Sequence, residues 1–152
     1  MRAPDSNYRG PRVWKMSDSD AVTVVRRFWE SVWNEGNVGA LDELFHPAVH
    51  ENGEALEIAQ FRNAVVSLRT SFPDFKVTIE ELIPLGADRV VSRVTFRGTH
   101  RGNWAGLPAS GRSFEVIGID IFTVEAGQVT ALWHSTDHYV IATQLGATMT
   151  SQ

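Results

Sequence analysis

The sequence predicts a single α+β domain in which helices come first and an antiparallel sheet follows. The chain has 152 residues, of which 43% are hydrophobic and 21% are charged, as in an ordinary globular domain. Up to about residue 71, apolar residues recur at the three- and four-residue spacing of helices. From residue 75 onward, β-branched and aromatic runs alternate with turns. Helices followed by meandering strands are typical of α+β folds.

Three helices are expected in the first part of the domain. The first follows a capping residue and runs to about Asn34, with its apolar residues on one stripe. A short second helix ends before a proline, and an extended piece and a turn separate it from the third. The second helix covers residues 38–45, the extended piece 49–52 and the third helix 57–71, and the possible caps of the first are Ser17, Ser19 and Asp20.

Four antiparallel strands are expected in the second part. Each is rich in β-branched and aromatic residues and is bounded by turn residues. A loop over residues 101–112, with three glycines and a proline, separates the second strand from the third, and residues 139–145 form a last helical turn. The strands cover residues 75–82, 89–99, 114–124 and 129–138.

Two terminal segments are expected to lie outside the folded domain, which covers residues 18–146. Residues 1–17 combine prolines, a glycine and several charges without apolar periodicity, so they are expected to form an extended arm. Residues 147–152 form a short tail.

The composition argues against several functional classes. A net charge of −4 and an isoelectric point near 5.7 disfavour nucleic-acid binding, which usually needs a basic patch. The absence of cysteine excludes disulfides, thiolate nucleophiles and zinc–thiolate sites. No apolar run approaches the ~20 residues of a membrane span, and the first residues lack the apolar core of a signal peptide. We therefore expect a cytoplasmic protein that does not bind membranes.

Asp120 and His134 are the candidate catalytic pair. They lie in two apolar strand-like runs, and each is seven residues from Gly127 in the turn between them. Folding the chain at this turn places them opposite each other, with Cβ atoms about 4.5–5.5 Å apart. A carboxylate that orients an imidazole is a general acid/base arrangement, because imidazole titrates near neutrality. Two alternatives stay open: a purely structural buried pair, and a one-residue slip of register that would separate the two.

Both faces of the predicted sheet are apolar. Ile117, Ile119 and Ile121 fall on one face together with Trp133, while Asp120 falls on the other among further apolar residues. A sheet with one wet face would alternate more cleanly between apolar and polar residues. Because the helices can cover only one face, the other is expected to bind a second copy of the chain in a homodimer.

Five short motifs resemble those of a known family, in the same order and spacing from about residue 18 to residue 146. They are Phe72-Pro73-Asp74-Phe75, Gly98-Thr99-His100-Arg101-Gly102, Gly106-Leu107-Pro108-Ala109-Ser110-Gly111-Arg112, Gly118-Ile119-Asp120-Ile121-Phe122 and Gly127-Gln128-Val129. With these motifs the chain resembles the SnoaL-like polyketide cyclases of the nuclear-transport-factor-2-like superfamily. The resemblance implies a cone of helices packed on a curved antiparallel sheet, with an apolar pocket inside.

The resemblance also implies a function. It is the aldol-type ring closure of an aromatic polyketide in antibiotic biosynthesis, carried out on a small hydrophobic substrate without a metal or cofactor. In the best-known cyclases of the family an acidic residue on the last strand is the general acid/base, and a histidine on the preceding strand assists it. Here His134 and Asp120 match these positions with the residue types exchanged. The exchange implies a related proton transfer, with His134 as the base and Asp120 as its orienting partner.

Eight further residues are candidates for contact with the substrate. The aromatic ones are expected to form walls, and the tryptophan on the glycine-rich loop can belong to a lid. The two histidines are expected at or near the pocket, and the aspartate reaches it only if a bulge turns it inward. No metal site is expected, because His134, Asp137 and His138 are near neighbours on one strand and point apart. The eight candidates are His50, Trp33, Phe72, Phe96, His100, Trp104, Phe122 and Asp137.

Two other kinds of function compete with ring closure. The same pocket can serve dehydration-coupled cyclisation, epoxide opening, hydroxylation or isomerisation. Limonene-epoxide-hydrolase relatives use an Asp-Arg-Asp set, which Gly118 and Phe122 do not supply here. The alternative from a different class is a non-catalytic module for ligand binding or assembly. An enclosed pocket to which both Asp120 and His134 are exposed favours an enzyme, and a cavity filled by side chains favours a module.

Overall fold

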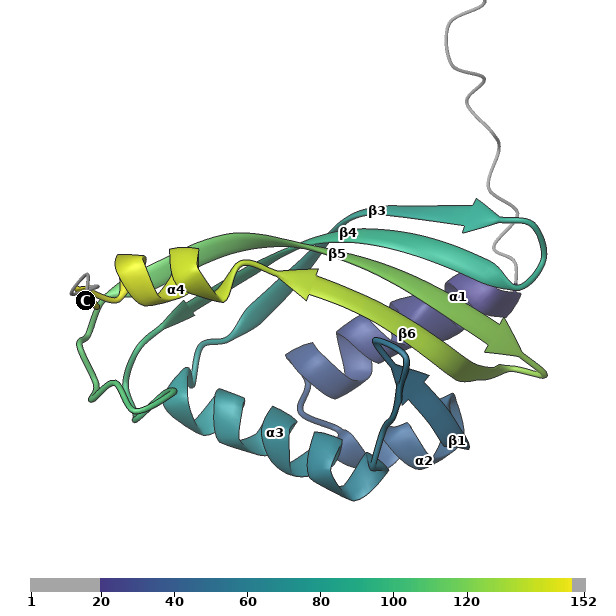
Figure 1. The fold of residues 1–152 in the computed structure, drawn as a ribbon, viewed down its shortest axis with the longest axis horizontal. Coiled ribbons are helices and arrows are strands. Elements are labelled where there is room, and N and C mark those ends of the chain that lie inside the picture. The colour runs from purple at the N-terminus through teal and green to yellow at the C-terminus, as the bar shows by residue number, and fades with distance from the viewer. Residues whose placement is uncertain (1–19, 149–152) are drawn as a thin grey trace, which may run out of the picture.

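In the computed structural model, which describes residues 20–148, a curved six-stranded sheet is covered on one face by helices (Figure 1). Its strands are β1 (Phe45–Glu51), β2 (Glu54–Ala55), β3 (Lys76–Leu85), β4 (Arg89–Thr99), β5 (Ser113–Glu125) and β6 (Gln128–Thr136). They lie in the order β2-β1-β6-β5-β4-β3. The predicted α+β class is confirmed, but the sheet is mixed rather than purely antiparallel, because β1 pairs with β6 in parallel. The predicted arm over residues 1–17 lies outside the described residues.

The helices follow the predicted order. They are α1 (Asp20–Arg27), η1 (Phe28–Asn34), η2 (Val38–Ala40), α2 (Leu41–Leu44), α3 (Ile58–Ser71) and α4 (His138–Gln144). The first predicted helix is continuous through η1, which is π-helical. Trp29 and Trp33 face the same side of this segment, because residues four apart are separated by about one helical turn. Within residues 20–148, no helix is both long enough and apolar enough to cross a membrane.

Two predicted boundaries are wrong: the helix predicted to end at Phe45 and the strand predicted to end at His138 both stop earlier. Phe45 has an extended backbone (φ −115°, ψ 135°) and begins β1, so α2 ends one residue earlier. Pro47 lacks an N–H to donate, and β1 accordingly departs from regular pairing with β6 between Phe45 and His50. At the other end, β6 stops at Thr136, and His138 is already the first residue of α4.

Strands β5 and β6 form a hairpin that places Asp120 directly opposite His134, as predicted. The connection consists of residues 126–127, both with positive φ, as the tight turns of hairpins require. A regular ladder from this turn would pair Asp120 with Trp133. One extra residue in β6, Thr130, interrupts the ladder and moves the pairing by one position. The two candidate catalytic residues therefore meet because the hairpin contains a bulge.

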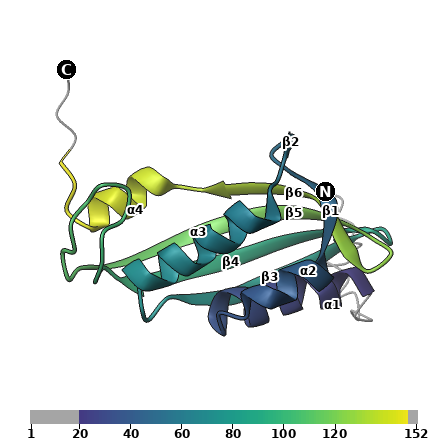
Figure 2. The same cartoon turned by 90° about the horizontal axis from the view of Figure 1, so that it is seen from below.

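The two faces of the sheet have different surroundings. The inner face packs on α1 and η1, α3 crosses in front of it (Figure 2), and Asp120 on this face is completely buried. On the outer face, Ile117, Ile119 and Trp133 keep 54%, 51% and 53% of their surface exposed. In the described part of the chain, the outer face thus exposes large apolar side chains beside the ion pairs Arg93–Glu81 and Arg97–Glu115.

Candidate active site

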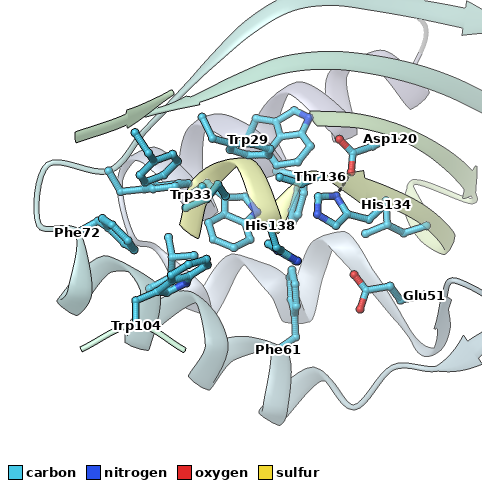
Figure 3. A pocket seen from close by; sticks show the side chains of 17 residues that line it. Trp29, Trp33, Glu51, Phe61, Phe72, Trp104, Asp120, His134, Thr136 and His138 are labelled. Atoms are coloured by element: carbon cyan, nitrogen blue, oxygen red, sulfur yellow. Dashed lines mark hydrogen bonds and ion pairs between the residues drawn. The ribbon is translucent and has the colours of Figure 1, made fainter. Parts of the chain in front are cut away.

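A cavity of about 210 Å³ lies between the helices and the inner face of the sheet (Figure 3). Aromatic side chains from η1, α3 and the loop between β4 and β5 form most of its wall, and five polar side chains interrupt the apolar lining. The apolar lining residues are Phe28, Trp29, Trp33, Phe61, Leu68, Phe72, Phe75, Phe96, Trp104, Phe114, Leu132 and Ile141, and the polar ones are Glu51, Asp120, His134, Thr136 and His138.

The Asp120–His134 pair forms the polar centre of this cavity. Nδ1 of His134 lies 2.5 Å from Oδ1 of Asp120, within hydrogen-bonding distance. The other carboxylate oxygen of Asp120 accepts a hydrogen bond from the Ser92 hydroxyl at 3.4 Å, and that hydroxyl accepts one from Nε1 of Trp29 at 3.3 Å. The Asp120 side chain is fully buried, whereas 28% of the His134 side chain is exposed. With Nδ1 held by Asp120, His134 has its Nε2 available for a substrate.

Burial and hydrogen bonding act in opposite directions on the two pKa values. Burial raises the pKa of the Asp120 carboxyl, and the hydrogen bonds from His134 and Ser92 only partly oppose this. Burial lowers the pKa of His134, but the hydrogen bond and charge of Asp120, together with the charge of Glu51, raise it above its ordinary value near 6.5. The imidazole is consequently a stronger base than a free histidine, while the buried carboxyl fixes its orientation.

The end of β1 holds His134 from the opposite side. The backbone N–H of His134 donates to Oδ1 of Asn52 at 2.9 Å, and the N–H of Asn52 donates to the Leu132 carbonyl at 2.9 Å. Asn52 adopts a positive φ of 51°, a conformation that asparagine tolerates better than most residues. These contacts fix β1 beside β6 and leave Glu51 on the cavity wall.

His50, a predicted substrate contact, does not line this cavity. His50 is exposed and lies outside the cavity, in a shallow depression formed with β2 and the start of α3. Side chains alternate along a strand, so the inward positions of β1 belong to Val49, which is buried, and to Glu51, which lines the cavity. The extended piece was predicted correctly, but with the wrong face inward.

Four of the predicted substrate contacts line the cavity: Trp33, Phe72, Phe96 and Trp104. Trp104 lies in a tight turn of the loop between β4 and β5, where its backbone exchanges two hydrogen bonds with Leu107. The ends of this loop are fixed to α3, because the N–H groups of residues 101 and 102 both donate to the Ser71 carbonyl.

Three other predicted contacts do not line the cavity. The ring of His100 is fully buried and stacks on Phe72 at a centroid distance of 5.3 Å. Its Nδ1 lies 3.1 Å from the Ser110 hydroxyl, so His100 stabilises the loop. Phe122 is a core residue behind the wall, and Asp137 caps α4 by accepting a hydrogen bond from the Val140 N–H at 2.9 Å.

Three polar lining residues were not predicted. Thr136 lies two positions after His134 on the same strand face, so strand periodicity could have identified it. Glu51 could have been found by the same rule, had the face of β1 been known. His138 gave no such signal, because it enters the wall only through the start of α4.

Metal binding has no support in the geometry. Among the described residues 20–148, no group of three or more histidine, cysteine or acidic side chains is arranged to hold a metal ion. Of the three residues that resemble a metal-ligand set in the sequence, His134 and His138 line the cavity, but Asp137 caps α4.

Comparison with known proteins agrees with this geometry. A family model described as SnoaL-like polyketide cyclase matches residues 23–145. No curated protein matches the chain.

Solved structures supply similar folds. TsrD from Streptomyces laurentii is 32% identical, with a TM-score of 0.77, and the match covers 88% of this chain and 100% of TsrD. A proposed polyketide cyclase from Acidithiobacillus ferrooxidans is 28% identical, with a TM-score of 0.73, over 86% of this chain and 96% of that one. AclR, a proposed hydroxylase from Streptomyces galilaeus, is 18% identical, with a TM-score of 0.72, over 82% of this chain and 93% of AclR. At that identity AclR shares the fold, and its reaction gives no guide to this one.

Proposed function

Because this chain belongs to the SnoaL-like polyketide cyclase family, we propose that it is a cofactor-independent acid/base enzyme that closes a ring in an aromatic polyketide by an intramolecular aldol reaction. The observation that carries the proposal is the Asp120–His134 pair, a buried carboxylate bound to an imidazole that faces an aromatic cavity. An open cavity beside a polar pair supports an enzyme over an assembly module, whose interior would be filled by side chains.

The reaction needs one proton acceptor that becomes a proton donor. Nε2 of His134 takes a proton from a carbon between two carbonyls, which leaves an enolate. The enolate carbon forms a bond to the carbon of another carbonyl group in the same polyketide. The π electrons of that C=O bond move to its oxygen, which becomes an alkoxide. The alkoxide then takes the proton from the His134 imidazolium. His134 thereby returns to its neutral form, with Asp120 still bound to Nδ1.

The aromatic wall has a separate role in this proposal. A flexible polyketide must fold so that its two reacting carbons meet, and a shaped apolar cavity can favour that conformer. Planar rings such as Trp33 and Phe96 suit stacking on flat aromatic substrates. The same walls exclude water, which strengthens the electrostatic interactions around the His134 imidazole.

Substitution of the pair tests the proposal. Turnover of candidate polyketide intermediates should fall by about 10²-fold or more in Asp120→Asn and His134→Gln, the scale of a lost general acid/base. His50→Gln makes the same chemical change at an exposed position outside the cavity and should leave turnover unchanged. If both variants of the pair fold, as judged by circular dichroism, and turn over at the wild-type rate, the pair is structural and the proposal is wrong.

We also propose that the outer face of the sheet binds a second copy of the chain. Ile83, Val91, Ile121 and Trp133 lie directly opposite one another in a row across β3, β4, β5 and β6. Ile119, at 51% exposure, extends this apolar surface. A soluble monomer rarely leaves so continuous an apolar surface uncovered, and a self-complementary patch on a sheet suits a two-fold dimer.

A further inference from the structure

Two polar atoms in the cavity wall lack a hydrogen-bond partner among the described residues. They are Nε1 of Trp33 and Oγ1 of Thr136, and both atoms are buried. Folded proteins pair almost all of their buried polar atoms, so each exception calls for an explanation. By contrast, Nε1 of Trp29, from the same π-helical segment, donates to the Ser92 hydroxyl.

Both residues line the same cavity as the proposed base. Thr136 is two residues beyond His134 on β6, so both side chains project from one face of the strand about 7 Å apart. Trp33 comes from η1 on the facing side, and its indole nitrogen points toward Thr136 and His138 (Figure 3). Both atoms are covered by neighbouring atoms, so a ligand that reaches them from the cavity has to displace this cover.

The chemistry of the two groups specifies what they can bind. An indole N–H only donates a hydrogen bond, and a threonine hydroxyl can donate one as well, so a single acceptor oxygen can satisfy both. The charged side chains on the wall favour an uncharged acceptor. They include the carboxyl groups of Glu51 and Asp120, and within residues 20–148 neither lysine nor arginine lines the cavity. A ketone oxygen fits this setting better than a carboxylate or a phosphate.

We infer that Trp33 Nε1 and Thr136 Oγ1 form a subsite for a carbonyl oxygen of the substrate. This inference rests on the proposed function, in which His134 removes a proton from the carbon beside that carbonyl. As the proton leaves, negative charge develops on the carbonyl oxygen, and two donors aimed at it stabilise the enolate more than the ketone. The subsite would thus both orient the substrate and lower the barrier to deprotonation.

Ligand binding tests the subsite without requiring turnover. The probes are 1-tetralone, a bicyclic aryl ketone, and tetralin, the matching hydrocarbon without the oxygen, each titrated by the change in tryptophan fluorescence or by calorimetry. The ratio of ketone to hydrocarbon affinity in the wild-type protein defines its ketone preference and is the reference, because the two probes differ in their cost of transfer from water. Thr136→Val and Trp33→Phe should each reduce this preference by about two- to tenfold, the scale of one lost hydrogen bond. Thr136→Ser keeps the hydroxyl and should retain the preference.

Matched controls make the same chemical changes on the outer face of the sheet. Thr123→Val on β5 and Trp133→Phe on β6 should leave the ketone preference unchanged. Tetralin binding shows in each variant whether the cavity is intact. If one variant fails to fold, the comparison of the other with its control decides the question.

The outcomes for the subsite and for the reaction are distinguishable. An unchanged ratio of ketone to hydrocarbon affinity in folded Thr136→Val and Trp33→Phe overturns the subsite whatever the turnover experiments show. If the preference is lost in both variants while Asp120→Asn and His134→Gln turn over normally, the subsite stands and the proposed reaction is wrong.

Discussion

Gly118 leaves space for an aromatic ring that borders the cavity, and a single added methyl group there should be costly. A Cβ on Gly118 would lie 2.3 Å from Cε2 of Phe96 and 3.1 Å from its Cζ. Because carbon atoms need about 3.5–4.0 Å of separation, the Phe96 ring must retreat by more than about 1 Å. Its centroid lies 5.8 Å from that of Trp29 and 6.4 Å from that of His134. The ring can therefore retreat only against the core, against the imidazole or into the cavity that it lines.

Overpacking of this kind typically costs about 1–3 kcal/mol. For a domain of this size each kcal/mol corresponds to about 2–4 °C, so Gly118→Ala should lower Tm by roughly 2–12 °C in a calorimetric scan. Turnover should fall as well, because the displaced ring presses on His134 or into the cavity. Gly39→Ala is the control, since its added Cβ would meet only Oδ1 of Asn37, at 3.6 Å.

A second substitution separates this explanation from a general loss of stability. If the Phe96 ring is the obstacle, Phe96→Leu combined with Gly118→Ala should cost less than the two single changes added together. The comparison is a double-mutant cycle measured by denaturant unfolding. A Gly118→Ala protein that melts at the wild-type temperature, or a cycle in which the two costs simply add, would refute the reasoning.

Three further predictions concern other parts of the molecule. Turnover requires neutral His134. Burial lowers the pKa of His134, but Asp120 and Glu51 raise it by more, so the net shift is upward from the ordinary value of 6.5. The value of kcat/KM should therefore fall as the pH drops through this raised pKa. Glu51→Gln removes one raising charge and should move this acidic limb to lower pH, and an unmoved limb would show that Glu51 does not influence the base. Ile119→Lys places a charge in the outer apolar face and should convert a dimer to a monomer in light scattering, whereas an unchanged mass would locate the interface elsewhere. Asp137→Ala removes the cap of α4 and should lower the unfolding free energy by about 0.5–2 kcal/mol in urea, a loss absent if the cap is dispensable.

Periodicity alone predicted the order of helices and strands and the faces of β5, where buried and exposed residues alternate without interruption. It also brought Asp120 and His134 together, although for an incomplete reason. Counting seven residues on either side of Gly127 ignored the two-residue turn, and the bulge at Thr130 compensated for that error. The sequence does carry a sign of the bulge, since Val129 and Leu132 both face the core although they are three residues apart.

The face of β1 could not be predicted in the same way. Residues 45–51 contain a proline and two histidines, and the only long apolar side chains inside the run are at its first position and at Val49. Such a short, mostly polar strand gives little alternation from which to assign a face. Its orientation is set instead by tertiary contacts, above all by the hydrogen bonds that join Asn52 to Leu132 and His134 of β6.

The irregular pairing of β1 between Phe45 and His50 and the bulge of β6 at Thr130 occur at the same level of the sheet. Glu51 and His134, which follow them on the two strands, both lie on the polar side of the cavity. Between Phe45 and His50, β1 advances five residues while its partner β6 advances only from Val129 to Ala131, the stretch that contains the bulge. Regular pairing resumes beyond this point, where β1 ends beside the strand that carries His134. With regular pairing, neither strand would bend at this point. Glu51, which sequence patterns missed, lies directly beyond this break, because pattern analysis assumes the regular pairing that the break removes.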